Sequence, residues 1–132
     1  MRTLHLPYSD AQEMFRRMVF NVVIRNQDDH TKNISFLMDR QGKWKLSPAY
    51  DIGFAYNPKG QWTASHQMSI NGKFNNLTRQ DLLVFAEKNN IKEAKEIIEK
   101  VNETAMSWGK IAHEVRVPPQ MIDDISSHFI IL

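Results

Sequence analysis

The stretch MVFNVVIRNQDDHTKNISF, residues 18–36, decides the fold. Its first seven residues are apolar except for one asparagine, and they end a pattern of apolar side chains at helical spacing that starts near residue 10. Residues 25–33 are then polar without a break, and residues 34–38 are mostly apolar. The pattern predicts a helix over residues 10–24 with a buried end, then a polar loop, then a strand.

Short signals on either side of this stretch predict where the neighbouring elements begin and end. Ser9 can cap the first helix, and Gln12 three residues later completes the pattern of a capping box. Beyond the polar loop, residues 39–42 read Asp-Arg-Gln-Gly, a turn, and residues 44–46 can return as a second strand, so a β-hairpin is predicted. Residues 54–76 show no clear periodicity, and a loop of that length is often functional.

The C-terminal part of the chain has the patterns of helices. Thr78, with Asp81 three residues later, resembles a helix start. Apolar residues at three-to-four spacing then predict a long amphipathic helix over residues 92–116, which Pro118 and Pro119 end before a last helix. The predicted fold class is α+β and predominantly α-helical, with one small β-hairpin, in a single domain over residues 1–132.

Composition narrows the class of protein. The 132 residues are 42% hydrophobic and 24% charged, which is typical of one folded domain. The formal net charge of +2 is too small to argue for direct nucleic-acid binding. No apolar run approaches the roughly 20 residues that cross a bilayer, and the N-terminus lacks the pattern of a signal peptide. We therefore expect no membrane association and a cytoplasmic location.

Three residues in and beyond the polar loop have the spacing of a phosphoryl-transfer site. Protein kinases use a loop in which an Asp is followed five residues later by a metal-binding Asn, and a second metal-binding Asp that opens an Asp-Phe-Gly turn. Here Asp28 precedes Asn33 by five residues, and Asp51 opens Asp-Ile-Gly beyond the predicted hairpin. Asp29 precedes Asn33 by only four residues, so we assign the catalytic carboxylate to Asp28 and expect Asp29 to make a local turn bond.

The motifs around these residues resemble one known family. NQDDHTKN at residues 26–33, SFL at 35–37 and LSPAYDI at 46–52 are similar to the C-terminal domain of the HipA family, bacterial toxin kinases of toxin–antitoxin pairs. HQMSINGK at residues 66–73 is also similar to a segment of many members, but its role cannot be read from the sequence. The resemblance, from residue 9 to about residue 117, implies a protein-kinase-like C-terminal lobe that transfers the γ-phosphate of ATP to a protein Ser or Thr.

The resemblance also implies roles for single residues. Asp28 matches the family's catalytic Asp, and His30 and Lys32 match loop residues that are expected near the transferring phosphate. Asn33 and Asp51 match the residues that bind the metal and, through it, the cofactor. The implied cofactors are ATP and Mg²⁺. The implied partners are a DNA-binding antitoxin of the HipB-like kind and a protein substrate.

One half of a kinase is expected to lie outside this sequence. Kinases need a glycine-rich loop over the phosphates and a lysine on a strand of the small lobe. The five glycines of this chain are too far apart to form such a loop, so we expect the nucleotide-holding N-terminal lobe upstream or on a separate chain. On this expectation the chain alone is inactive. A non-catalytic interaction module that binds an antitoxin or an N-lobe chain stays open as an alternative.

A metal-dependent hydrolase is a further alternative, and it would use Asp28, Asp29, His30 and Asp51. The sequence lacks a pair of histidines at ligand spacing, which disfavours it. The remaining histidines of the second half are expected at the surface or at interfaces: His66, His113 and His128.

Overall fold

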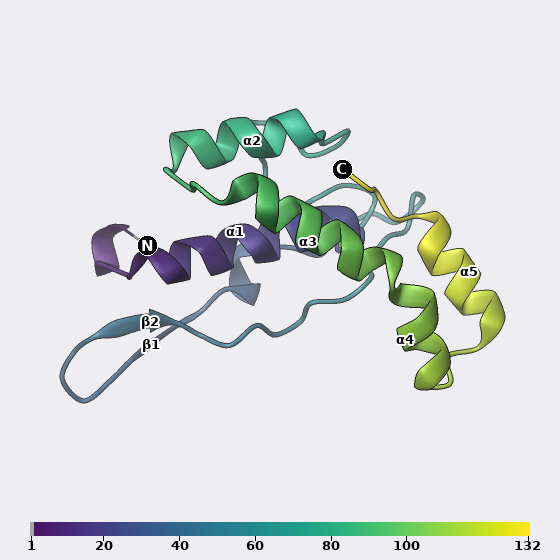
Figure 1. The fold of residues 1–132 in the computed structure, drawn as a ribbon, viewed down its shortest axis with the longest axis horizontal. Helices are drawn as coiled ribbons and strands as arrows, with labels where there is room; N and C mark the ends of the chain where they lie inside the picture. Colours follow the sequence, from purple (N-terminus) through teal and green to yellow (C-terminus); the bar gives the residue numbers. More distant parts are fainter. Residues whose placement is uncertain (1) are drawn as a thin grey trace.

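The structure is a computed structural model, and it describes residues 2–132. The helices pack on one another, and one small hairpin projects at the edge of the molecule, at the lower left of Figure 1. The predicted class, α+β and predominantly helical, is confirmed: the chain is 46% helical, and its strands form one antiparallel hairpin. In chain order the elements are η1 (Arg2–Leu4), α1 (Tyr8–Val23), η2 (Thr31–Asn33), β1 (Phe36–Met38), β2 (Trp44–Leu46), α2 (Arg79–Lys88), α3 (Ala94–Met106), α4 (Trp108–Glu114) and α5 (Pro119–Ser127), where η marks a 3₁₀ helix.

The core lies between α1, α2 and α3. Val19, Val22 and Val23 on the second half of α1 are buried, which confirms the prediction of a buried helix end. Phe15 on the same helix stacks on Phe85 of α2, with ring centroids 6.4 Å apart. Because a fully buried apolar side chain contributes about 1.5–3 kcal/mol, these contacts make α1 a rigid support for the polar loop that follows it.

The predicted start of the first helix is wrong. Helix α1 begins at Tyr8, and Pro7 occupies the N-cap position without a side-chain cap. Pro7 is suited to this position, because its φ of −64° with an extended ψ of 158° precedes the helix without strain. Gln12 makes no capping box with Ser9; its Nε2 donates to Glu93 at 2.7 Å instead.

The predicted hairpin is confirmed. Strands β1 and β2 pair antiparallel, and in their turn the Asp39 carboxylate accepts two main-chain amide bonds of 2.9 Å. Gly42 completes the turn with φ +80°, a conformation that L side chains rarely adopt. Asp10 on α1 accepts a bond from the amide of Leu46 at 2.8 Å. The hairpin is therefore held against α1.

The capping box predicted at the start of α2 is also confirmed. The amide of Asp81 donates to the Thr78 hydroxyl at 3.3 Å, and the Asp81 carboxylate accepts from the amide of Thr78 at 2.9 Å. Lys73 adds an ion pair of 2.7 Å to the same carboxylate. The box therefore also holds the end of the 66–73 segment against α2.

The prediction of one continuous helix over residues 92–116 is wrong, because two helices occupy this range. Helix α3 ends at Met106, and α4 begins at Trp108. At the break, the Ser107 hydroxyl donates to the main-chain oxygen of Thr104 at 2.7 Å, a local bond that competes with the regular helical pattern. Trp108 then donates from Nε1 to the main-chain oxygen of Ile122 at 3.2 Å, which packs α4 against α5.

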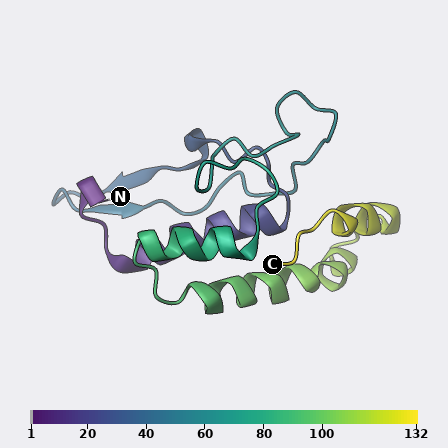
Figure 2. The same cartoon turned by 90° about the horizontal axis from the view of Figure 1, so that it is seen from above.

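The long loop between β2 and α2 lies over the C-terminal end of α1. In Figure 2 the hairpin and this loop lie on one side of α1, and α3 lies on the other. Between residues 54 and 76 the structure places only isolated bridges, at Ala55 with Asn26 and at Ile70 with Lys73. Every helix in the described range is too short or too polar to cross a membrane.

Candidate functional site

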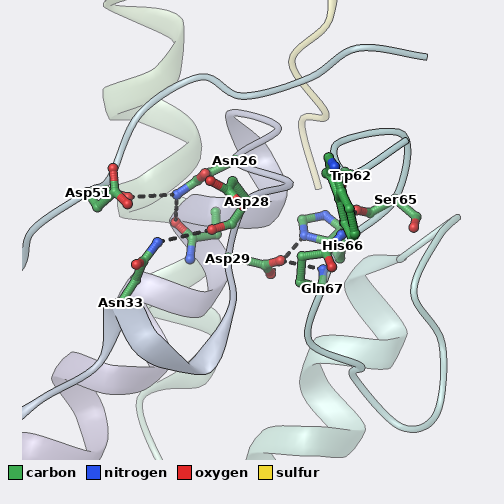
Figure 3. Close-up of polar contacts among 10 residues, drawn as sticks. Asn26, Asp28, Asp29, Asn33, Asp51, Trp62, Ser65, His66 and Gln67 are labelled. Atoms are coloured by element: carbon green, nitrogen blue, oxygen red, sulfur yellow. Dashed lines mark hydrogen bonds and ion pairs between the residues drawn. The ribbon is translucent and has the colours of Figure 1, made fainter. Parts of the chain in front are cut away.

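Hydrogen bonds hold the polar loop beside the Asp51 turn (Figure 3). Asn26 is 3% exposed, and its Nδ2 donates to Oδ1 of Asn21 on α1 at 3.0 Å and to the main-chain oxygen of Asp51 at 3.4 Å. The amide of Gln27 donates to the main-chain oxygen of Ala55 at 3.0 Å. Two segments that are distant in sequence are therefore placed side by side.

Asn33 and Asp51 each carry a side-chain oxygen that accepts no hydrogen bond from residues 2–132. Nδ2 of Asn33 donates to the main-chain oxygen of Asp28 at 3.0 Å, which orients the amide and leaves its Oδ1 available. The Asp51 carboxylate is exposed and is likewise not engaged by the described chain. Asp51 also has φ +53°, a left-handed conformation that Asp and Asn adopt more readily than most other L residues.

A cavity of about 230 Å³ lies beside these two residues. Asn33, Asp51 and His30 contribute to its polar lining. Asp28 does not line it; this residue is half-exposed, and its carboxylate lies 3.8 Å from Nε2 of His30. The structure thus brings Asn33 and Asp51 to one cavity. Asp28 lies next to this cavity, because its main-chain oxygen accepts a bond from the Asn33 side chain. The rest of the lining is largely apolar and includes Met14, Phe15, Met18, Ile52, Met68 and Ile70.

His30 lines the cavity, whereas Lys32 does not. Nδ1 of His30 is buried and has no hydrogen-bond partner within the part of the chain that the structure describes. A buried polar atom of this kind calls for a polar partner, and a bound anion beside the cavity would supply one. Lys32 is exposed on η2, and only its main-chain oxygen is engaged, by the Tyr50 hydroxyl at 2.8 Å. Its place near a phosphate stays a prediction.

Asp29 does not make the local turn bond that the sequence suggested. It is 8% exposed, its carboxylate accepts a bond from the amide of Gln67 at 2.7 Å, and it lies 2.9 Å from Nδ1 of His66. Both partners come from the long loop, far along the chain. The expected surface position of His66 is also wrong, because its side chain is 3% exposed. His113 is exposed as expected, and His128 is half-buried.

The donor set fits a hard cation that arrives with a phosphate. No three His, Cys, Asp or Glu side chains in residues 2–132 are placed to hold a metal ion together. Asp29, which the hydrolase alternative would use, has both carboxylate oxygens bound to His66 and the Gln67 amide. Mg²⁺ is commonly bound by one or two protein oxygens, with waters and substrate phosphates completing its shell. Oδ1 of Asn33 and the carboxylate of Asp51 are oxygens of this kind.

Three residues that hold the polar loop in place have no role predicted from the sequence: Asn26, Gln27 and His66. The sequence feature that comes nearest to them is the 66–73 segment, which is similar to a segment of HipA proteins. The sequence does not indicate what that segment does. Its contact with Asp29 joins residues that are 37 positions apart, and no local pattern records such a contact.

A helical α+β lobe with a polar loop, a hairpin and an Asp turn in this order is what the HipA-type resemblance implied. The chain belongs to the family of HipA-like C-terminal domains, which it matches over residues 1–108. "Putative kinase Y4dM" of Sinorhizobium fredii (strain NBRC 101917 / NGR234) is 30% identical over 126 residues, which cover 91% of this chain and 30% of that protein. "Putative kinase Y4mE" of the same strain is 41% identical over 46 residues, 35% of this chain and 11% of that protein. The chain spans less than a third of these relatives, and no solved structure matches it.

Proposed function

We propose that this chain is the catalytic lobe of a HipA-like protein serine/threonine kinase, which transfers the γ-phosphate of ATP to a Ser or Thr of a protein. One observation carries the proposal: Asn33 bonds the main chain of Asp28 and, together with Asp51, leaves an unengaged oxygen at one cavity. The family match and two relatives that are named as kinases support it.

Each residue then has a chemical role. Asp28 orients the substrate hydroxyl and accepts its proton. Asn33 and Asp51 would hold Mg²⁺, which would neutralise charge on the phosphates. His30 and Lys32 supply donors beside the transferring phosphate. Since catalysis of phosphoryl transfer is mostly positioning and electrostatic stabilisation, the bonds that hold the polar loop to the Asp51 turn are part of the mechanism.

The remaining parts of the kinase are proposed from the family resemblance. The glycine-rich loop and the lysine that grip the nucleotide would come from another part of a longer protein or from a separate chain. A DNA-binding antitoxin is the proposed partner, and a protein is the proposed substrate. If the following test finds no such site, the alternative function, a non-catalytic interaction module, replaces the kinase proposal.

The test uses Mn²⁺ with ATP as a paramagnetic probe, and the amide resonances of the chain are followed by NMR. We expect line broadening centred on residues 28–33 and 51–53, and its loss in Asp51→Asn. Asp124→Asn is the matched control, because that carboxylate on α5 is 73% exposed and far along the chain from the site. Broadening that is centred elsewhere, or that persists in Asp51→Asn, would overturn the proposed site.

A further inference from the structure

The polar loop is held from two sides. On one side, Asn26 and Asn33 make the contacts to the Asp51 turn and to Asp28 that are described above. On the other side, Gln27 and Asp29 bind residues 62–67 of the long loop. Figure 3 shows the second group around Asp29, next to the first group around Asn33. Asp28 stands between two residues that are both bound to the same distant segment.

The contacts of Gln27 and Asp29 are buried and well satisfied. The Gln27 side chain is 1% exposed and, with its amide turned to suit its neighbours, donates to the main-chain oxygens of Thr63 at 2.8 Å and Ala64 at 3.3 Å. Asp29 uses both carboxylate oxygens, one for the amide of Gln67 at 2.7 Å and one for Nδ1 of His66 at 2.9 Å. The segment 62–67 is itself held, because the Gln67 side chain donates to the main-chain oxygens of Trp62 and Ser65.

We infer that Asp29 and His66 form a positioning pair that fixes the geometry of the polar loop, and with it the direction of Asp28, by binding the loop to residues 62–67. The inference rests on the proposed function only in giving Asp28 a catalytic task. In regulated kinases, the segment beyond the metal-binding Asp is often ordered by phosphate–arginine contacts. Here a buried carboxylate–imidazole contact between Asp29 and His66 orders the corresponding segment without any modification.

His66 is the better residue to change, because Asp29 lines the cavity and His66 does not. Hydrogen–deuterium exchange is measured on the full chain at a temperature at which circular dichroism shows every variant folded. His66→Ala removes the contact, His66→Asn keeps an N–H donor near the position of Nδ1, and His113→Ala is the matched control on an exposed histidine. Asp29→Asn, which keeps the size of the side chain, serves as a second variant if His66→Ala does not fold.

We expect His66→Ala to speed exchange of the amides in residues 26–30 and 62–67 by about tenfold or more beyond any rise in helix α3, because exchange in α3 reports overall stability and the loop amides also report local opening. His66→Asn should recover part of the protection, and His113→Ala should match the natural chain. Unchanged exchange in residues 26–30 would overturn the positioning role. An equal rise in α3 would also overturn it, because the pair would then support only overall stability.

The two proposals fail separately. If the Mn²⁺ test finds no site at Asn33 and Asp51, the proposed function falls, and the exchange result still decides the role of Asp29 and His66. If the protein transfers phosphate, His66→Ala should lower kcat by about tenfold and change the KM for ATP little, since His66 does not line the cavity. A change in KM alone would contradict a positioning role.

Discussion

Replacing each of the two adjacent aspartates by asparagine should have opposite effects on stability and on chemistry. Asp28→Asn and Asp29→Asn both remove one negative charge and keep the size of the side chain. Their surroundings differ: the Asp28 side chain is 47% exposed and its carboxylate lies 3.8 Å from Nε2 of His30, whereas the Asp29 side chain is 9% exposed and binds two donors.

The structure sets the expected magnitudes. Hydrogen bonds to a charged group contribute about 1.5–3 kcal/mol, and an asparagine at position 29 retains one acceptor oxygen where the carboxylate has two. One of the two donors, the Gln67 amide or His66, then faces an amide NH2 group in place of an acceptor oxygen, and the other keeps only a neutral acceptor. We expect Asp29→Asn to lower the free energy of unfolding by about 2–4 kcal/mol. For Asp28→Asn, an exposed position, the change should stay within about 0.5 kcal/mol.

Thermal unfolding followed by circular dichroism measures the difference. With about 3–5 °C per kcal/mol for a domain of this size, Asp29→Asn should lower Tm by about 10 °C, and Asp28→Asn should lower it by about 2 °C or less. Urea titration of the same variants gives the free energies independently. Equal melting temperatures for the two variants would refute the reasoning, because the burial and bonding of Asp29 would then contribute nothing to stability.

The remaining predictions concern catalytic activity, nucleotide binding and the ionisation of Asp81 at low pH. In a form of the protein that transfers phosphate, Asp28→Asn should lower the rate about 10²–10⁴-fold, and Asp51→Asn at least as much, in a radiolabelled transfer assay; full activity in both would contradict the kinase proposal. The 132-residue chain alone should show no autophosphorylation and only weak ATP binding, and micromolar affinity by calorimetry would reveal a phosphate cradle that the sequence does not suggest. The Lys73 ammonium and the Thr78 hydroxyl and amide lower the pKa of Asp81 from 3.8 to about 2. Because that pKa is lowered in the folded state, the contribution of Asp81 to stability is complete above about pH 4 and is lost as the pH falls through about 2. Carboxyl NMR titration should therefore show Asp81 ionised at pH 3, and a normal pKa would contradict the assignment.

The sequence predicted those parts of the fold that depend on neighbours in the chain. The Thr78–Asp81 box was predictable because both halves of the interaction lie within one helical turn. The buried end of α1 was predictable because its apolar residues surround the helix. The same local logic failed at Ser9, where the preceding Pro7 already fits the cap position. It also failed at Ser107, where a side-chain bond and the packing of Trp108 interrupt a regular pattern.

The candidate site was predictable in its residue types and not in its supports. The five-residue interval from Asp28 to Asn33 reflects a local geometry, which the bond from Asn33 to the main chain of Asp28 makes visible. The contact of Asp29 with His66 spans 37 residues and depends on how the long loop returns across the end of α1. Neither propensity nor spacing encodes that return, so the sequence indicated only a local turn bond for Asp29 and a surface or interface position for His66.

The burial of Asp29 strengthens the assignment of Asp28 as the group that takes the substrate proton. A general base must approach the hydroxyl within hydrogen-bond reach and must have a lone pair free to receive the proton. Each carboxylate oxygen of Asp29 already accepts a hydrogen bond, and a proton on this group would remove the negative charge that strengthens its contacts with His66 and the Gln67 amide. The Asp28 carboxylate accepts no hydrogen bond within the described residues and is half-exposed, so it can meet a substrate without breaking a contact that holds the loop. Asp29 thus supports the loop, and Asp28 is free to react. The five-residue spacing to Asn33 and the burial of Asp29 both assign the chemical role to Asp28.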